Sequence, residues 1–184
     1  MNVNRSIAAV VAILCAVVYG SSALAAPAPH HELPDSQLAE LRRATAQFQR
    51  VEVALAAGYE LGYVNGNGVR IIAGCIAQPT LGAMGYHYFN KALIDDLAVD
   101  PLMPEGLVYE TSASGQLKLV SVEYVVPGPG SVPPGVSEPP TVFGMPMHIL
   151  VPPPGPGFYV HHAWIWKHNP AGMFADWNPE VSCP

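Results

Sequence analysis

The stretch from 157 to 184 constrains the fold more than any other segment, because it holds all three tryptophans, three of the seven histidines and one of the three cysteines. Residues 158 to 167 alternate with the two-residue period of a strand, and both faces of that strand would be mostly apolar or aromatic. A strand that is apolar on both faces belongs inside a sheet. We therefore expect 158–167 to be the central strand of a sheet.

A tight turn is expected directly after this strand. Asn169 stands at the first turn position, Pro170 at the second and Gly172 at the fourth, an order that suits a type I turn. Such a turn would send the chain back through an aromatic tail toward Cys183.

A disulfide is expected between Cys75 and Cys183. These two cysteines remain once a predicted export signal is removed, and thiols in export compartments are normally oxidised. The bridge would close a loop long enough to stabilise the fold by roughly 4 to 5 kcal/mol if it acts through chain entropy. The alternative, a pair of metal-binding thiolates, lacks the close Cys-x-x-Cys spacing of a structural zinc site.

The first 25 residues predict a secretory signal peptide. Arg5 gives it a positive start, residues 7 to 19 are an apolar run, and small residues at Ala23 and Ala25 suit cleavage after Ala25. The apolar run is too short to span a bilayer. We expect an exported protein, periplasmic or extracellular, with no membrane anchor after signal cleavage.

A single domain is expected from 35 to 184, after a flexible lead from 26 to 34, since half of the residues are hydrophobic and the length suits one core. Between 127 and 157 prolines and glycines crowd the chain, which disfavours regular structure apart from a short strand from 142 to 151. We expect an ordered excursion there rather than a linker, because the expected central strand and the second cysteine lie beyond it.

The charge balance disfavours two classes of partner. Arg5 is the one charged residue of the predicted signal, so the remaining chain carries 7 basic and 14 acidic residues, a net charge of −7. Nucleic acids and anionic membrane surfaces bind clusters of Lys and Arg. We therefore expect neither as a partner.

The expected fold class is α+β, with an N-terminal helix packed on a mainly antiparallel β-sheet. The helix would begin with Asp35 as its cap and end at about Ala57, before Gly58. Parallel strands would need helical crossovers, and the sequence after Leu97 offers none. The other expected elements are a loop over 59–67, strands over 69–76 and 82–90, a short helix capped by Asn90 and running through Leu97, and a hairpin of 107–111 with 117–126.

Histidines and carboxylates that suit a metal site recur in the expected strands. Imidazole and carboxylate are the usual ligands of zinc, iron, manganese and copper, and neighbouring strands can bring them to one point. Adjacent residues point to opposite faces of a strand, so at most one of His161 and His162 can join His87, and the spacing leaves open which one. The candidates are His87, Glu123, His161 and His162, together with His168 and, further out, Asp176.

Each candidate also has an alternative role in packing. A histidine among tyrosines and tryptophans often bonds to a backbone carbonyl or a carboxylate, and Glu123 has Lys167 and Arg70 as alternative partners. The spacing matches neither the cupin pattern nor the helical zinc-protease pair. Nucleophilic catalysis and phosphate binding are disfavoured too, because the sequence has no Gly-x-Ser-x-Gly elbow and no Walker loop.

Several segments resemble a family of small exported bacterial proteins of uncharacterised function. The resemblance lies in residues 84–90, 100–105, 107–110, 119–125 and 164–183, which include the motifs Gly-Tyr-His-Tyr and Trp-x-Trp-Lys-His-Asn-Pro followed by Ala-Asp-Trp-Asn-Pro. It extends from the first expected helix to the end of the chain and implies export. The family brings no catalytic role to any residue.

Three functions are compatible with these features. First is an exported binding module that holds a divalent metal ion or a small ligand through His87, Glu123 and one of His161 and His162. Second is a metal-dependent enzyme with the same residues, which ranks lower because the sequence identifies no reaction and no catalytic residue. Third is a structural or interaction protein in which the histidines only pack.

Overall fold

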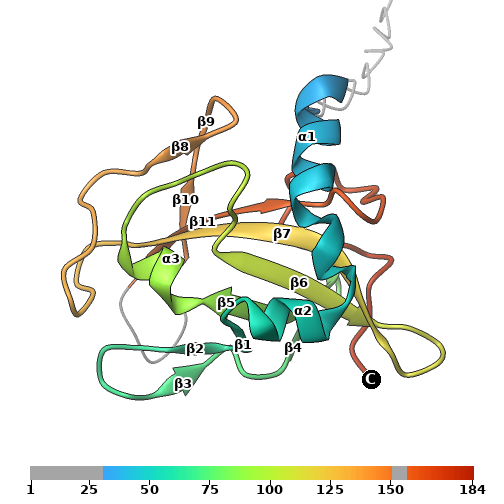
Figure 1. Ribbon diagram of the computed structural model, residues 1–184, viewed down its shortest axis with the longest axis horizontal. Coiled ribbons are helices and arrows are strands. Elements are labelled where there is room, and N and C mark those ends of the chain that lie inside the picture. The colour runs from blue at the N-terminus through green and yellow to red at the C-terminus, as the bar shows by residue number, and fades with distance from the viewer. Residues whose placement is uncertain (1–30, 151–156) are drawn as a thin grey trace, which may run out of the picture.

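The computed structural model describes residues 31–150 and 157–184 (Figure 1). The predicted signal peptide, most of the predicted lead and a short part of the proline-rich excursion therefore lie outside the described residues. Within them, no helix is long and apolar enough to cross a membrane.

Seven strands of the described chain form one sheet in the order β1-β5-β6-β7-β11-β10, with β4 added to β5. Every neighbouring pair of these strands is antiparallel, which confirms the mainly antiparallel sheet expected from the sequence. The strands are β1 (Tyr59–Leu61), β4 (Cys75–Gln78), β5 (Gly82–Asn90), β6 (Gly106–Thr111), β7 (Leu117–Pro127), β10 (His148–Leu150) and β11 (Phe158–Ala163).

The middle of the sheet is the hairpin of β6 and β7, and not the strand expected there. The hairpin itself is confirmed, and β7 is buried over most of its length. β11 ends at Ala163 and lies between β7 and the short edge strand β10. The strand expected over 158–167 is therefore internal to the sheet, as predicted, but it is shorter and is not the middle strand. Regular pairing with β7 stops after Ala163: the Trp164 amide donates to the Met173 carbonyl of the tail (2.9 Å), and the Trp166 amide bonds to β7 again at the Val120 carbonyl (3.1 Å). Both faces of β11 are buried because the tail and other segments cover them.

Two expectations for the C-terminal tail are confirmed. The Gly172 amide donates to the Asn169 carbonyl (2.9 Å), which closes the expected turn. Cys75 and Cys183 form a disulfide that joins β4 to the end of the tail, with Cα atoms 5.6 Å apart. The C-terminal tail, which follows β11 near one edge of the sheet, is thereby fixed to β4 at the other edge.

The N-terminal helix is broken, unlike the single helix expected over 35–57. The helical elements are α1 (Asp35–Thr45), the 3-10 turn η1 (Ala46–Gln49), α2 (Val51–Ala56) and α3 (Lys91–Asp95). Arg50 adopts an extended conformation, which separates η1 from α2. Pro34, and not Asp35, occupies the N-cap position of α1. Gly58 follows α2 with a φ of +92°, as expected for a helix-ending glycine.

Polar contacts join these helices to the rest of the chain. The Tyr109 hydroxyl donates to the Phe48 carbonyl, and Arg42 Nε donates to the Ile165 carbonyl, both at 2.7 Å. At α3, the Asn90 side chain accepts a bond from the Ala92 amide (3.1 Å), which confirms the expected cap.

Short strands replace the loop expected over 59–67 and the longer strand expected over 69–76. Besides β1 and β4, this region contains β2 (Tyr63–Val64), which pairs with β3 (Arg70–Ile71) in a separate two-stranded sheet. The longer strand is interrupted because Ile72 has a φ of +56°, a left-handed conformation that β-branched residues rarely adopt. β4 starts only at Cys75.

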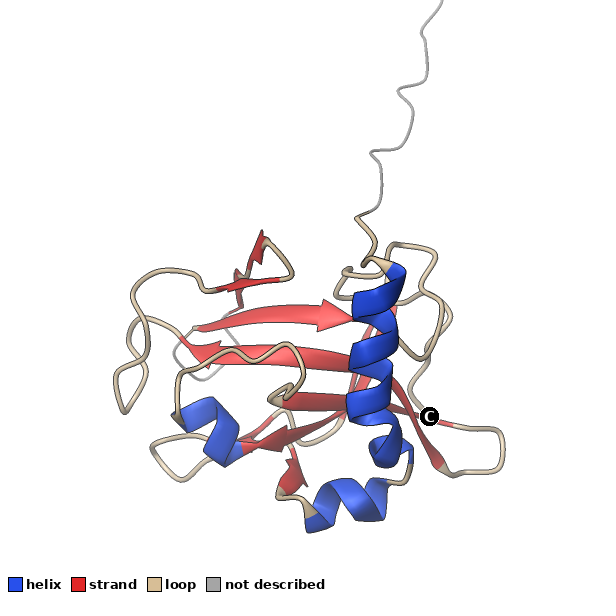
Figure 2. Cartoon of the chain, turned by 45° about the horizontal axis from the view of Figure 1, so that its top comes forward, coloured by secondary structure: helices blue, strands red, loops and turns tan. Residues whose placement is uncertain are grey.

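The described part of the proline-rich excursion is packed onto the domain. In place of one strand over 142–151, it contains β8 (Thr141–Val142) paired with β9 (Met145–Pro146), followed by β10 (Figure 2). Val142 and Met147 are almost fully buried. The Tyr159 hydroxyl of β11 also donates to the Ser137 carbonyl of the excursion (3.0 Å).

Candidate metal centre

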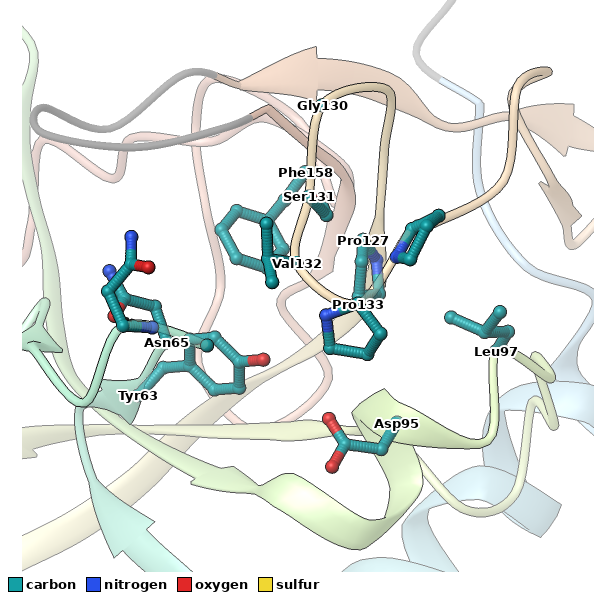
Figure 3. Close-up of a pocket in the computed structure, with 13 residues that line it drawn as sticks. Tyr63, Asn65, Asp95, Leu97, Pro127, Gly130, Ser131, Val132, Pro133 and Phe158 are labelled. Carbon is teal, nitrogen blue, oxygen red and sulfur yellow. Dashed lines mark hydrogen bonds between the residues drawn. The ribbon is translucent and has the colours of Figure 1, made fainter.

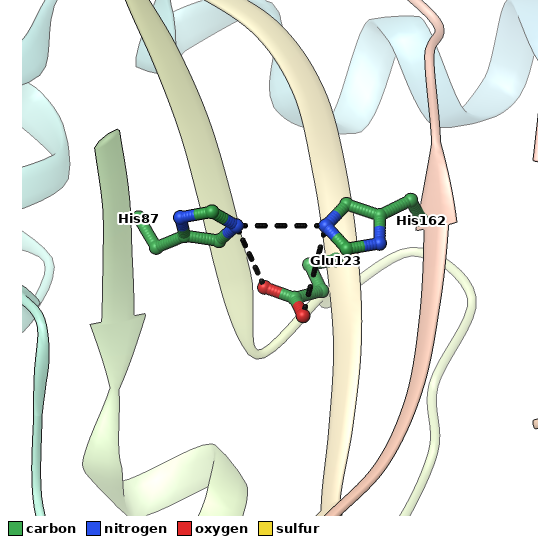
Figure 4. A group of neighbouring side chains, drawn as sticks. All are labelled: His87, Glu123 and His162. Carbon is green, nitrogen blue, oxygen red and sulfur yellow. Dashed lines mark hydrogen bonds and ion pairs between the residues drawn. The ribbon is translucent and has the colours of Figure 1, made fainter. Parts of the chain in front are cut away.

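Three strands bring His87, Glu123 and His162 together on one face of the sheet (Figure 4). His87 comes from β5, Glu123 from β7 and His162 from β11. Glu123 and His162 are direct partners in the pairing of β7 with β11. His87 reaches them across β6, because Gly106 stands opposite Glu123 and has no side chain. A Cβ at Gly106 would lie only 3.0 Å from the Glu123 Cβ.

A bulge in β7 sets the face on which Glu123 lies. The register between β6 and β7 shifts at Val120, which becomes an extra residue of β7. Leu119 before the bulge therefore packs into the same cluster as Val122 after it, although strict alternation puts them on opposite faces. Strict alternation of faces along the expected strand over 117–126 therefore fails at this point. Glu123 lies on the face opposite to Val122.

The two histidine Nε2 atoms and the Glu123 carboxylate lie at the corners of a small triangle, in which each histidine faces a different carboxylate oxygen. His87 Nε2 lies 3.5 Å from His162 Nε2 and 3.6 Å from Glu123 Oε2, and His162 Nε2 lies 3.7 Å from Glu123 Oε1. These distances exceed those of good hydrogen bonds, about 2.7 to 3.2 Å. A tetrahedral zinc ion with ligands at about 2.0 to 2.2 Å holds its ligand atoms about 3.4 Å apart. The triangle therefore suits one shared ion better than a set of hydrogen bonds.

The three side chains are almost completely shielded from water. The exposed fraction is 2% for His87, 3% for Glu123 and 0% for His162. Among the described residues, His87 Nδ1 and Glu123 Oε2 have no hydrogen-bond partner. A buried polar group without a partner destabilises a fold by about 1 to 3 kcal/mol, and more if it is charged. A cation bound between the three side chains would offset this cost for the carboxylate.

Burial displaces the pKa values of all three groups. It lowers the pKa of His87 to about 3, with repulsion from His162 acting in the same direction. It raises the pKa of Glu123 to about 7, although His162 opposes this shift. Burial alone would lower the pKa of His162, but the carboxylates of Glu123 and Asp176 raise it above its ordinary value. At neutral pH His87 is therefore uncharged, which is the form that binds a metal ion.

Asp176 and His148 form a second layer behind His162. One carboxylate oxygen of Asp176 lies 3.2 Å from His162 Nδ1, and the other lies 3.1 Å from His148 Nε2. Burial alone would raise the pKa of Asp176, but its bonds to His148 and His162 lower it well below its usual range. Because the ionised carboxylate only accepts hydrogen bonds, His162 carries its proton on Nδ1 and directs the Nε2 lone pair toward His87 and Glu123.

His148 is a functional candidate that the sequence did not indicate. It lies on β10 opposite Val160, two residues from His162 along β11. Its neighbourhood in the sequence is rich in proline and glycine and has no other candidate ligand, so only the pairing of β10 with β11 brings it near Asp176. The one available signal was a histidine inside the short strand expected over 142–151.

The other expected candidates lie outside the cluster. His161 points to the opposite face of β11, where its ring contacts Phe174 with centroids 4.9 Å apart. Burial lowers the pKa of His161 to about 4. His168 is exposed beyond the end of β11. Of the two adjacent histidines, His162 is thus the one that joins His87, and neither His161 nor His168 contributes a ligand atom to this triangle.

The alternative partners expected for Glu123 are engaged elsewhere. Lys167 Nζ lies 2.6 Å from Glu110 Oε2, and Arg70 Nη2 lies 2.9 Å from Glu60 Oε2. The prediction that either cation pairs with Glu123 is therefore wrong. Each basic residue pairs with another carboxylate, and Glu123 faces the two histidines instead.

Two clefts in the described structure share Tyr63 and Phe158. The larger, of about 230 Å³, lies between the β2–β3 loop, the end of α3 and the proline-rich segment (Figure 3). It is lined by Asn65, Asp95 and several prolines, and by no residue of the described triangle. The smaller cleft, of about 20 Å³, is lined mostly by apolar side chains and by Glu123, but by neither His87 nor His162.

Comparison with models of known protein families, with curated proteins and with solved structures finds no match for this chain. Its function therefore has to be inferred from the residues and geometry of this site.

Proposed function

We propose that this chain is an exported metal-binding module in which His87, Glu123 and His162 together hold one divalent ion, with Zn²⁺ as the best match. The proposal rests on the convergence of these ligand groups: the two Nε2 atoms lie 3.5 Å apart, and each lies 3.6 or 3.7 Å from a different oxygen of Glu123. Two imidazole nitrogens and one carboxylate oxygen are a donor set that zinc accepts, and the separations suit its tetrahedral geometry. Asp176 supports the proposal as the outer carboxylate that orients His162.

Export is part of this proposal. It is supported by the signal peptide predicted over the first 25 residues. The disulfide between Cys75 and Cys183 also fits an oxidising compartment. Exported proteins meet metal ions from outside the cell, so a binding module there has a ready supply of its ligand.

Elemental analysis of protein purified without a histidine tag tests the proposal. We expect about one zinc ion per chain, and loss of the ion from His87→Ala and from His162→Ala, because each removes a ligand that cannot be replaced. His161→Ala is the matched control, since its side chain lies on the opposite face. Protein that carries no metal and takes up none from added Zn²⁺, Co²⁺ or Mn²⁺ in calorimetry would refute the proposal.

A metal-dependent enzyme is the second candidate, and one observation favours it. Three protein ligands are the number found in catalytic zinc sites, where water or substrate takes the fourth position, whereas structural sites have four. X-ray absorption of the zinc-loaded protein distinguishes the two. A fourth ligand from water would support the enzyme hypothesis, and a fourth ligand from the protein would refute it.

Histidines that only pack are the third candidate. The unpartnered Oε2 of Glu123, as found within the described chain, argues against it, because packing alone gains nothing from a buried carboxylate oxygen without a partner. Replacement of the triangle by apolar residues distinguishes this role. A packing cluster predicts higher stability for His87→Leu together with Glu123→Leu and no change in metal content.

A further inference from the structure

We infer that the larger cleft, between the β2–β3 loop, the end of α3 and the proline-rich segment, binds one neutral sugar of monosaccharide size. The inference is independent of the proposed metal centre, because His87, Glu123 and His162 do not line this cleft.

Tyr63 places a hydroxyl without a protein partner in the cleft. The residue is only 6% exposed, and its hydroxyl points into the open space between the walls (Figure 3). It forms no hydrogen bond with any residue that the structure describes, whereas the hydroxyls of Tyr59 and Tyr109 each donate to a backbone carbonyl at 2.7 Å. Hydroxyls of buried tyrosines usually find a partner. The Tyr63 hydroxyl is therefore available to a ligand in the cleft.

Asn65 offers a second donor beside Tyr63. Its side-chain oxygen accepts hydrogen bonds from the Asn67 and Val69 amides, both at 3.0 Å, and these bonds fix the orientation of its carboxamide. The residue is 8% exposed, and its Nδ2 has no partner within residues 31–150 and 157–184. A ligand with several hydroxyl groups can accept from both Asn65 and Tyr63.

The charges at the cleft favour a neutral ligand. Asp95 is the one charged side chain of the lining, and Lys91 Nζ bonds to its Oδ2 from outside the cleft. This pairing offsets the charge of Asp95, and no basic side chain stands among the described lining residues to hold an anion. A charged ligand would lose hydration without gaining a partner, while a hydroxyl can still donate to Asp95 Oδ1.

The apolar walls fit a puckered ring better than a flat one. The rings of Tyr63 and Phe158 lie at 84° to each other with centroids 5.4 Å apart, so they form no flat slot for a planar heterocycle. Leu97 and Pro133 add saturated surface on the other side of the cleft (Figure 3). The C–H groups of a sugar ring can pack on such surfaces while its hydroxyls reach the few polar atoms.

The cleft has the size of one such ring, and its walls are joined to each other. Its volume is about 230 Å³, less than the roughly 300 to 1,000 Å³ of pockets for drug-sized molecules. Gly66 of the β2–β3 loop lies against Val132 of the proline-rich segment, where a Cβ would come within 1.9 Å of the Val132 carbonyl oxygen. The Ser131 hydroxyl donates to the Gly128 carbonyl (2.8 Å) and holds the second wall in place. The cleft is therefore preformed for a molecule the size of one hexose.

Isothermal titration calorimetry of the purified protein tests this inference. The first probes are glucose, galactose and mannose. The others are the amino sugar and the uronic acid derived from whichever hexose binds, in mildly acidic buffer that keeps both charged, and uracil as a neutral planar ring. We expect one binding site per chain for at least one hexose, and weaker binding of the other three probes. Absence of binding by all three hexoses would overturn the inference, as would any other probe that binds as tightly as the best hexose.

Tyr63→Phe and Asn65→Asp place the hexose in this cleft. Tyr63→Phe removes the hydroxyl and keeps the ring, and Asn65→Asp keeps the oxygen that holds the loop but loses Nδ2. Each should weaken hexose binding roughly 3- to 10-fold, the effect of one lost hydrogen bond.

Tyr88→Phe is the matched control, because Tyr88 is also buried, at 9% exposed, but lies outside the lining and packs against Tyr109. It should bind the hexose as the original protein does, and thermal unfolding checks that all three variants are folded. Unchanged affinity in either folded cleft variant, or an equal loss in Tyr88→Phe, would overturn the inference.

Discussion

The two faces of the sheet treat their buried polar groups differently. On the His161 face, which carries Tyr109, Tyr124 and Tyr159, each of these tyrosine hydroxyls donates to a backbone carbonyl at 2.6 to 3.0 Å. On the His162 face, the Nε2 atoms of His87 and His162 lie 3.5 Å apart and within 3.7 Å of the Glu123 carboxylate. The first face bonds its tyrosine hydroxyls to the backbone, and the second gathers potential ligand atoms at one point.

His161 shows that burial and a missing partner do not by themselves mark a ligand. Its Nε2 also has no hydrogen-bond partner in the part of the chain that the structure describes, yet its ring lies against Phe174. What distinguishes His162 is convergence, because its Nε2 lies within 3.7 Å of ligand atoms from two other strands. Adjacent residues of one strand can therefore have unrelated roles.

The largest expected effect comes from removing either histidine of the triangle. His162→Ala and His87→Ala should each weaken Zn²⁺ binding by more than about 100-fold, and the double variant should be little worse, because the first loss already breaks the shared coordination. His161→Ala should bind as the original protein does. Competition with a zinc chelator measures all four, and a loss of affinity in His161→Ala as large as in His162→Ala would break the distinction between the faces.

A smaller effect is expected from the carboxylate behind His162. Asp176→Asn should weaken Zn²⁺ binding by about 10- to 100-fold, since the amide no longer fixes the proton of His162 on Nδ1. Glu110→Gln is a control, because Glu110 pairs with Lys167 away from the centre. Unchanged affinity in Asp176→Asn would mean that packing alone orients His162.

The His161 face should determine part of the acid sensitivity of the metal-free protein. Burial lowers the pKa of His161 from an ordinary 6.5 to about 4. Between these values the unfolded chain binds a proton that the folded chain does not, so stability falls as the pH falls through this window. His87 contributes in the same direction, because its pKa is also lowered.

His161→Phe removes the contribution of that residue alone. Urea unfolding with a chelator present should show that the variant loses roughly 1 to 2 kcal/mol less stability than the original protein between pH 7 and pH 4.5, a value reduced from the full linkage because the ring is not entirely shielded. Equal acid sensitivity of the two proteins would show that His161 is already protonated in the folded state.

The smallest effect is expected at His168, which shares the sequence parity of His162 but is exposed beyond the end of β11. His168→Ala should change the free energy of unfolding by less than about 0.5 kcal/mol, as is usual for surface positions. Zinc affinity should change by less than about twofold, because the alternation that would put His168 on the same face as His162 does not continue beyond the strand. Chelator competition and thermal unfolding check both numbers, and a clear loss of zinc would place His168 in the site.

Features that depend on residues close together in the chain could be predicted. The hairpin of β6 and β7, the Asn90 cap and the turn from Asn169 to Gly172 are confirmed, because the chemistry of turns and caps is local. Local signals failed at the first helix, where Arg50 breaks a pattern that the sequence continues. Predicting the disulfide required only the expected compartment and the number of cysteines that remain after signal cleavage, since two cysteines can pair in one way.

The sequence by itself determined the ligand types and the rule that His161 and His162 face opposite ways, because alternation along a strand follows from backbone geometry. The tertiary structure decided which of the two joins His87, since that depends on the register of β11 against β7 and on the bulge at Val120. It also decided that Asp176 and His148 stand behind His162. Register and strand order arise from contacts between distant segments, whose combined burial and hydrogen bonding have no signature in any one segment.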